Sequence, residues 1–368
     1  MKAAVKVKKT VGRLGRRYGG RPFQTVRKLC YDSLRLMPEI RAVFGLWRKD
    51  FADKGSEDAL FYDRYLGKPA ERRPEKEGIV CMYDGLILHG GLTDRIRGLL
   101  TTYREAKRRG IPFYIHWDHP FRLEEFLEPA TFDWRIRPEE ISYSSEHAFP
   151  VLIQDHRRVS NRLRLLAALS RRRRQTHVYS NADNAKGHYA GLFRELFRPT
   201  PLVQREVDRH LKELGAKYHA FSFRFIGLLG DFHDQQEDRL LPGEAEAFLT
   251  KVADEFRKEL KAVPEGHRVL VATDSPTFLS LAPKLDARIY VVEGDLKHLD
   301  MSPGDYREAW LKTFVDQFLL MHASKVTLMR TGRMYRSGFP RFAAEVGGVP
   351  FADHAFSVNH TYRNAANV

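Results

Sequence analysis

Cysteine and long apolar runs are both scarce in this 368-residue chain. Its two cysteines, Cys30 and Cys81, are too few for a disulfide framework or a zinc site, so we interpret both as reduced, packed thiols. No apolar run approaches the roughly 20 residues that span a bilayer, and the first residues lack the apolar core of a secretory signal. We therefore expect a cytoplasmic protein.

Several common catalytic motifs are missing too. The sequence contains no GxxxxGK[ST] phosphate loop, no GxGxxG after a strand, no HExxH and no GxSxG, which disfavours standard NTPases, dehydrogenases, zinc proteases and hydrolases. The cluster His116, Asp118 and His119 is the only one that resembles a set of metal ligands. Alternation along a strand would turn His119 away from the other two, so we favour a structural or substrate-contacting role over a metal.

The net charge of +15 is concentrated near the N-terminus. Residues 1–49 hold 14 Lys or Arg against 2 Asp or Glu. Residues 23–37 have the apolar spacing of an amphipathic helix, which could lie on an anionic membrane or pack on the rest of the protein. Charge alone also permits a nucleic-acid-binding protein, although no recognised binding module is present, so we regard nucleic acid as an unlikely partner.

Element order predicts three regions. A basic N-terminal helical segment with a Pro-rich linker covers residues 1–75, a first α/β domain covers 76–205, and a second covers 206–368. In the second domain we predict strands at 217–229, 267–275, 287–294 and 325–332, and helices at 244–261, 276–285, 306–322 and 340–346. Strands separated by single helices predict a parallel, doubly wound sheet.

A glycine loop joins a strand to a helix in the first domain. Residues 78–88 are predicted to form the strand, an amphipathic helix ends at Gly110, and residues 111–117 form the next strand. The loop between them contains His89, Gly90, Gly91 and Asp94. Because open α/β sheets bind ligands at the carboxyl ends of their strands, this loop is a candidate binding element.

Three segments resemble the GDP-fucose-dependent fucosyltransferase superfamily, which includes the bacterial nodulation, core α-1,6 and protein O-fucosyltransferases. They are GGLTDRIRGLL, AFSFRFIGLLGDF, and ATDSPTFLSLA together with SKVTLMRTGRMYRSGFPRFAAEVGGVPF. The resemblance implies two Rossmann-like domains facing a cleft, the GT-B arrangement, with the nucleotide-sugar donor in the C-terminal domain. It also implies that His89, Gly90 and Gly91 belong to a loop on the acceptor side.

The second segment stands where the family has a His-any-Arg-Arg-any-Asp strand. Arg224 matches the arginine that binds the donor diphosphate, and its fork of donors suits phosphate oxygens. Ser222 replaces the histidine and Phe225 replaces the second arginine. The acidic residue is either lost or displaced to Asp231, which we place with the acceptor-side loop. A structural salt bridge is the alternative role for Arg224.

The third segment matches the family's Asp-Ser turn and its final Ser-any-Phe helix start. Asp274, at the end of a strand, is suited to accept hydrogen bonds from a guanine edge or from ribose hydroxyls. Ser275 is expected to cap the following helix. Ser337 precedes another helix, where a pyrophosphate would lie beside Gly338 and Phe339. Plain helix capping explains either serine equally well.

The resemblance implies transfer of fucose from GDP-fucose to a hydroxyl of a glycan or glycolipid, with inversion. Arg224 would stabilise the departing GDP, and Asp94 is the first candidate for the base, before Asp231 and His89. Asp94 is equally suited to cap a helix that begins at Arg95. The Asp-any-Asp metal motif of the other transferase architecture is absent, so we expect no metal and no cofactor.

Three alternatives stay open. The enzyme could use another nucleotide sugar, because the arginine strand is substituted. A basic nucleic-acid-binding protein and a catalytically inactive scaffold are the others. For the fucosyltransferase hypothesis, we expect a cytoplasmic enzyme that the basic N-terminus can bring to the inner face of the membrane.

Overall fold

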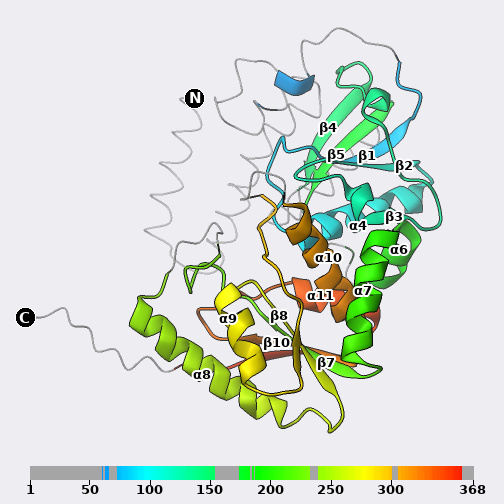
Figure 1. Cartoon of the computed structure of the whole chain (residues 1–368). Coiled ribbons are helices and arrows are strands. Elements are labelled where there is room, and N and C mark those ends of the chain that lie inside the picture. The colour runs from blue at the N-terminus through cyan, green and yellow to red at the C-terminus, as the bar shows by residue number, and fades with distance from the viewer. Residues whose placement is uncertain are drawn as a thin grey trace, which may run out of the picture. The chain divides into compact units, whose positions relative to one another are not determined.

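The computed structural model of the chain describes residues 60, 63–65, 73–153, 174–182, 185, 187–232, 239–300 and 306–358 (Figure 1). The predicted amphipathic helix at 23–37 and Cys30 lie outside the described residues. Contacts divide the described residues into two compact units. The smaller contains those up to Gly78 and those of Pro138–Val178, and the larger contains Ile79–Arg137 and those from Tyr179 onward.

The smaller unit has a buried polar network beside its strands. β4 (Ala148–Ile153) and β5 (Gln175–Ser180, whose last two residues belong to the larger unit) are neighbours in a sheet and buried along their whole length. The Tyr65 hydroxyl lies 2.8 Å from Nδ1 of His177, and His177 Nε2 lies 3.0 Å from the Gln175 side-chain oxygen. These polar side chains are therefore paired in the interior of this unit.

The larger unit begins with a strand, a helix and a parallel strand. β1 (Gly78–Tyr83) pairs with β2 (Phe113–Trp117), and α4 (Leu92–Arg109) connects them. β1 is shorter than the predicted strand because the Asp84 side chain accepts a hydrogen bond from Leu86 N and turns the chain. Gly110 ends α4 in the left-handed conformation, as predicted.

Short elements connect this part to the second half of the larger unit. These are η2 (Leu123–Glu125), β3 (Leu127–Pro129), α6 (Tyr189–Leu196), β6 (Phe197–Pro199) and α7 (Pro201–Leu214). β3 and β6 form an antiparallel pair. Thr200 caps α7, since its hydroxyl accepts a hydrogen bond from Val203 N.

The second half is built on a five-stranded sheet in the order β11-β10-β7-β8-β9, in which every neighbouring pair is parallel. The strands are β7 (Tyr218–Phe223), β8 (Arg268–Thr273), β9 (Ile289–Val291), β10 (Lys325–Arg330) and β11 (Phe351–Ala355). The helices are α8 (Pro242–Leu260), α9 (Pro276–Leu281), α10 (Arg307–His322) and α11 (Phe339–Gly347), with the short η5 (Ala282–Lys284) after α9. The parallel sheet is therefore confirmed, and β11 was not predicted.

Helices cover both faces of this sheet (Figure 1). Phe221 and Phe223 of β7 pack against Phe256 of α8 and Phe278 of α9 in one core cluster. Each fully buried phenylalanine contributes about 1.5–3 kcal/mol by transfer from water. The alternate residue Tyr218 faces the other side, where its hydroxyl donates to the Leu319 carbonyl of α10. The loops at the carboxyl ends of β7 and β8 are thus held by two rigid helical layers.

Candidate functional site

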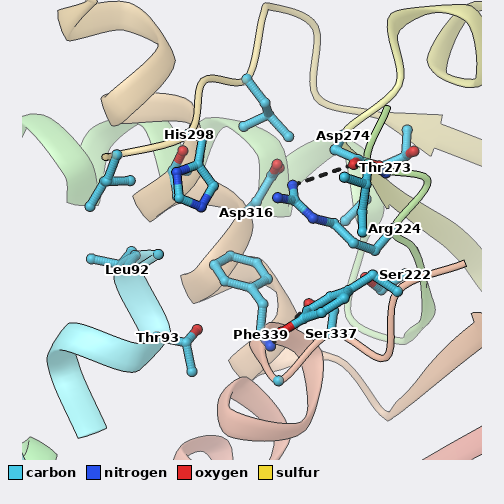
Figure 2. Close-up of a pocket in the computed structure, with 18 of the residues that line it drawn as sticks. Leu92, Thr93, Ser222, Arg224, Thr273, Asp274, His298, Asp316, Ser337 and Phe339 are labelled. Carbon is cyan, nitrogen blue, oxygen red and sulfur yellow. Dashed lines mark hydrogen bonds and ion pairs between the residues drawn. The ribbon is translucent and has the colours of Figure 1, made fainter. Parts of the chain in front are cut away.

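A cavity of about 370 Å³ opens at the carboxyl ends of β7 and β8, wholly within the larger unit. Its walls come from the glycine loop and first turn of α4, the ends of both strands, residues 296–299, one face of α10, and the segment before α11 (Figure 2). Parallel α/β sheets bind ligands at this edge. The cavity is therefore the candidate functional site.

Asp274 follows β8 and fixes the backbone after β7. Its buried carboxylate accepts hydrogen bonds from Phe225 N at 2.8 Å and Ile226 N at 2.7 Å. These bonds hold a turn in which Ile226 has a φ of 57°, a left-handed conformation that disfavours a β-branched residue. Burial raises the pKa of Asp274, while Arg224 and the two N–H groups act in the opposite direction. Asp274 lines the cavity, but both of its oxygens serve the fold.

The sequence suggested that Arg224 lies inside a strand. In the structure it lies in the loop after β7. β7 ends at Phe223 because the next residues turn onto Asp274. The Arg224 guanidinium is 3.4 Å from the Asp274 carboxylate and 4.5 Å from the ring centre of Phe232. Its side chain is 23% exposed and lines the cavity. A salt bridge and access to a ligand are therefore both present.

A second buried carboxylate, Asp316, reaches the cavity from α10. Lys312 donates to its Oδ2 at 2.7 Å, and both side chains are about 5% exposed or less. The other oxygen, Oδ1, is buried and has no hydrogen-bond partner. Burial raises the pKa of Asp316, and Lys312 opposes this shift. Figure 2 shows Asp316 on the cavity wall, between His298 and Arg224 in that view.

Sequence reasoning missed Asp316, although a signal was present. α10 is apolar nearly all round, and residues such as Trp310, Phe314 and Leu319 are buried. Lysine and aspartate four residues apart within such a helix cannot both reach solvent, so they must be paired or bind something. The pattern Lys312-x-x-x-Asp316 could therefore have marked the position.

Ser337, Gly338 and Phe339 line the cavity at the start of α11. Gly338 is the N-cap residue, and the Ser337 hydroxyl accepts a hydrogen bond from Phe339 N at 3.2 Å. Pro340 has no N–H group. Two of the first helical positions thus offer no free backbone donor, which leaves fewer groups for an anion than the sequence suggested.

Ser275 and Asp231 serve the start of α9. Ser275 accepts a hydrogen bond from Phe278 N, which confirms helix capping, and donates to Asp231 at 2.6 Å. Asp231 also accepts from Thr277 N at 3.0 Å. Neither Ser275 nor Asp231 lines the cavity. Asp231 therefore does not join the glycine loop at the cavity, because its carboxylate turns toward the start of α9, and its acceptor-side role stays a prediction.

Asp94 lines the cavity from the first turn of α4 and is about half exposed. α4 begins at Leu92, with Gly91 as its N-cap, so the alternative that Asp94 caps a helix beginning at Arg95 is wrong. The Asp94 carboxylate lies 4.0 Å from Arg97 on the next turn. Among the predicted bases that the structure describes, Asp94 alone faces the cavity.

His89 lies beneath the glycine loop and does not line the cavity. Its ring is 2% exposed and packs 4.7 Å from the ring centre of Tyr83. Burial, with a contribution from the charge of Arg95, lowers the pKa of His89 from 6.5 to about 3. The histidine is therefore a neutral core residue, whereas Gly90 and Gly91 do line the cavity.

Within the described ranges, no group of three or more His, Cys, Asp or Glu side chains could hold a metal ion. His116 Nε2 lies 3.3 Å from the Asp118 carboxylate, consistent with the expected alternation along β2. None of the helices in the described part of the chain combines the length and apolar character needed to cross a membrane.

No family model matches the sequence, and no curated protein matches it either. Solved structures do match. A NodZ α-1,6-fucosyltransferase soaked with GDP-fucose is 17% identical, with 74% of this chain and 93% of that chain covered, at a TM-score of 0.50. The same enzyme crystallised with GDP, and fucosyltransferase NodZ from Bradyrhizobium, each share 18% identity, with 73% of this chain and 92% of theirs covered, at a TM-score of 0.50.

This chain has the fold of a fucosyltransferase. The resemblance read from three short segments is therefore confirmed at the level of the fold. At this identity the likeness shows the fold alone, so the chemistry has to be argued from the residues of the cavity.

Proposed function

We propose that this protein transfers fucose from GDP-fucose to a hydroxyl group of a glycan or glycolipid. The unpaired, buried Oδ1 of Asp316 in the wall of the cavity is the observation that carries this proposal. A buried carboxylate oxygen without a partner costs free energy, so it indicates a ligand that donates hydrogen bonds.

Guanine is the nucleobase that fits this carboxylate. Its N1–H and N2–H groups are adjacent donors, which match the two oxygens of one carboxylate. Adenine offers a donor beside an acceptor, and uracil offers a single donor between two acceptors, so both would leave polar atoms mismatched. Hydrogen bonds to a charged group contribute about 1.5–3 kcal/mol each, enough to favour GDP by at least tenfold.

Arg224 is the candidate for the diphosphate. Its guanidinium lines the same cavity, lies 3.4 Å from the Asp274 carboxylate, and offers a fork of donors that suits phosphate oxygens. Lys297 adds a second cation to the cavity wall. Fixed positive charges of this kind neutralise a leaving diphosphate, which supports a metal-independent reaction.

The reaction that we propose is a single displacement with inversion. The acceptor hydroxyl oxygen attacks C1 of fucose, its proton passes to the Asp94 carboxylate, and the bond from C1 to the β-phosphate oxygen breaks as GDP leaves. Asp94 lines the cavity and is half exposed, so an acceptor can reach it. General-base assistance of this kind contributes about 10²–10⁴-fold.

The GT-B arrangement belongs to the same proposal. We assign residues 76–205 to the acceptor side and 206–368 to the donor side, supported by the parallel sheet that lies entirely in the second range. The basic residues before position 50 would bring a cytoplasmic enzyme to the inner face of a membrane that carries a lipid-linked acceptor. Flotation with anionic and neutral liposomes tests this, and equal binding to both would reject it.

Thermal shift with a nucleotide panel tests the donor. GDP should raise the melting temperature more than UDP or ADP does, and Arg224→Ala should remove most of that shift. Arg257→Ala, on the exposed face of α8, is the matched control and should retain it. The proposal is rejected if GDP-fucose is not turned over when glycan and glycolipid acceptors are supplied.

Another nucleotide sugar is the second candidate, and one observation favours it. Phe225 stands in place of the family's second arginine and is fully buried in the core cluster, so that position supplies no charge to a ligand. A larger shift with UDP or ADP than with GDP would support this candidate.

A further inference from the structure

One buried ion pair links the glycine loop to the segment that contributes residues 296–299 to the cavity wall. Arg95, in the first turn of α4, lies 2.5 Å from Asp300, which follows residues 296–299. Both side chains are at most 2% exposed. The residues are 205 positions apart in the chain, so the pair joins two segments that are distant in the sequence.

The pair fixes Gly90 from two directions. The Asp300 carboxylate accepts a hydrogen bond from Gly90 N, and Arg95 donates to the Gly90 carbonyl at 3.2 Å. Arg95 also donates to the His119 carbonyl and lies 5.3 Å from the ring centre of Trp117. Gly90 has a φ of 83°, so its backbone adopts a conformation that glycine tolerates and other residues disfavour.

Asp94 occupies the space beside Gly90. A Cβ atom at position 90 would lie only 3.0 Å from the Asp94 carboxylate, so the position of the carboxylate depends on the glycine and on the course of its backbone. Asp300 therefore fixes two things at once, the loop that supports Asp94 and the end of the segment 296–299. Buried ion pairs add little net stability relative to apolar side chains, which makes a specific positioning role the better account of this one.

We propose that Asp300 and Arg95 are positioning residues that hold Asp94 at the distance needed to take the proton of the acceptor hydroxyl. This inference rests on the proposed function. Neither side chain lines the cavity, so neither contacts substrate. A displacement of about 1 Å in a reacting group can cost on the order of 100-fold in rate.

Asp300→Asn tests the proposal, because it keeps the shape and removes the charge. The expected result is a fall in kcat of about 100-fold, with the Kd for GDP and the acceptor KM each within about threefold of the wild type. Arg95→Lys keeps the charge but loses the forked hydrogen bonds, so its kcat should lie between that of the wild type and that of Asp300→Asn. Asp295→Asn is the control from the same segment, since that side chain is 73% exposed, and its kcat should be unchanged.

Gly90→Ala is the second variant, which leaves the ion pair in place and displaces Asp94 directly. It should also lower kcat without changing the Kd for GDP. Crystals of Asp300→Asn should show the Asp94 carboxylate displaced. The positioning role is wrong if Asp94 keeps its place in those crystals, or if kcat of Asp300→Asn equals that of Asp295→Asn. A wild-type protein that turns over no GDP-fucose overturns the proposed function instead, and the crystals still decide the positioning role.

Discussion

Two buried aspartates line the cavity, one at the end of a strand and one on a helix, and they differ in the hydrogen bonds that they make. Asp274, at the end of β8, directs both oxygens to backbone N–H groups and lies beside Arg224. Asp316, on α10, pairs one oxygen with Lys312 and leaves the other without a partner. A carboxylate in a segment that resembles a family motif can therefore serve the fold, while the carboxylate that we propose to bind the nucleobase lies outside those segments.

Removal of the fold-serving carboxylate should have the largest effect. Asp274→Ala leaves two backbone N–H groups and the Arg224 guanidinium without their partner, so we expect a loss of about 3–5 kcal/mol in the free energy of unfolding. Urea denaturation measures it. Asp286→Ala, which removes a more exposed partner of Arg288, is the control and should cost about 1 kcal/mol or less. If both variants lose the same free energy of unfolding, Asp274 has no special role in the fold, and its contrast with Asp316 is wrong.

Changes at Asp316 should act mainly on nucleotide binding. Asp316→Asn should weaken GDP binding by about 10–100-fold and ADP binding much less, because a carboxamide presents one acceptor in place of two. Isothermal titration calorimetry measures both. The double variant with Lys312→Met and Asp316→Leu replaces the pair with apolar side chains, so it should keep near wild-type stability without any preference for GDP. If the double variant still prefers GDP over ADP, Asp316 does not bind the nucleobase.

The pH dependence of GDP binding should separate the two aspartates further. Burial raises the pKa of Asp316 above the usual 3.8, so its contribution to stability is present below pH 3.8 and is lost as the pH rises through the raised pKa. Guanine donors favour the ionised form, so GDP affinity should increase over the same window, by at most about tenfold per pH unit. Thermal shifts by GDP across that range measure it. In Asp316→Asn this increase should disappear; if it remains, another group is responsible.

The two serines should give the smallest effects. Ser275→Ala removes the cap of α9 and should cost about 1 kcal/mol in stability without changing the Kd for GDP, because Ser275 does not line the cavity. Ser337→Ala should weaken GDP binding by a few-fold at similar stability, since Ser337 does line it. Denaturation measures the stability of both variants, and calorimetry measures their GDP binding. Weaker GDP binding in Ser275→Ala, with lower stability in Ser337→Ala, would contradict these roles.

The architecture of the second half could be predicted because its pattern is simple. Predicted strands alternate there with single helices, and this order permits little except a parallel sheet. The ends of β1 and β7 could not be placed, because apolar residues continue past both. The strands stop where a carboxylate binds the backbone, at Asp84 and Asp274, and spacing of apolar residues does not report such bonds.

The site was predictable only where a segment resembles a known family. Arg224, Asp274 and Ser337 were predicted from such segments, and they line one cavity. Asp316 was missed because the spacing of apolar residues shows only which face of a helix packs in the core. Asp300 was missed because its partner Arg95 lies 205 positions away in the sequence. Long-range pairs of this kind require coordinates.

The separation of Asp316 from Arg224 has a consequence for how such enzymes diversify. The arginine is bound through Asp274 to the strand ends, so its position cannot change without the turn after β7. Asp316 and Lys312 form a self-contained pair, one helical turn apart on the same rigid helix. Under the roles that we propose, substitutions at these two positions alone can change the preferred nucleobase and leave the arginine that faces the diphosphate in place.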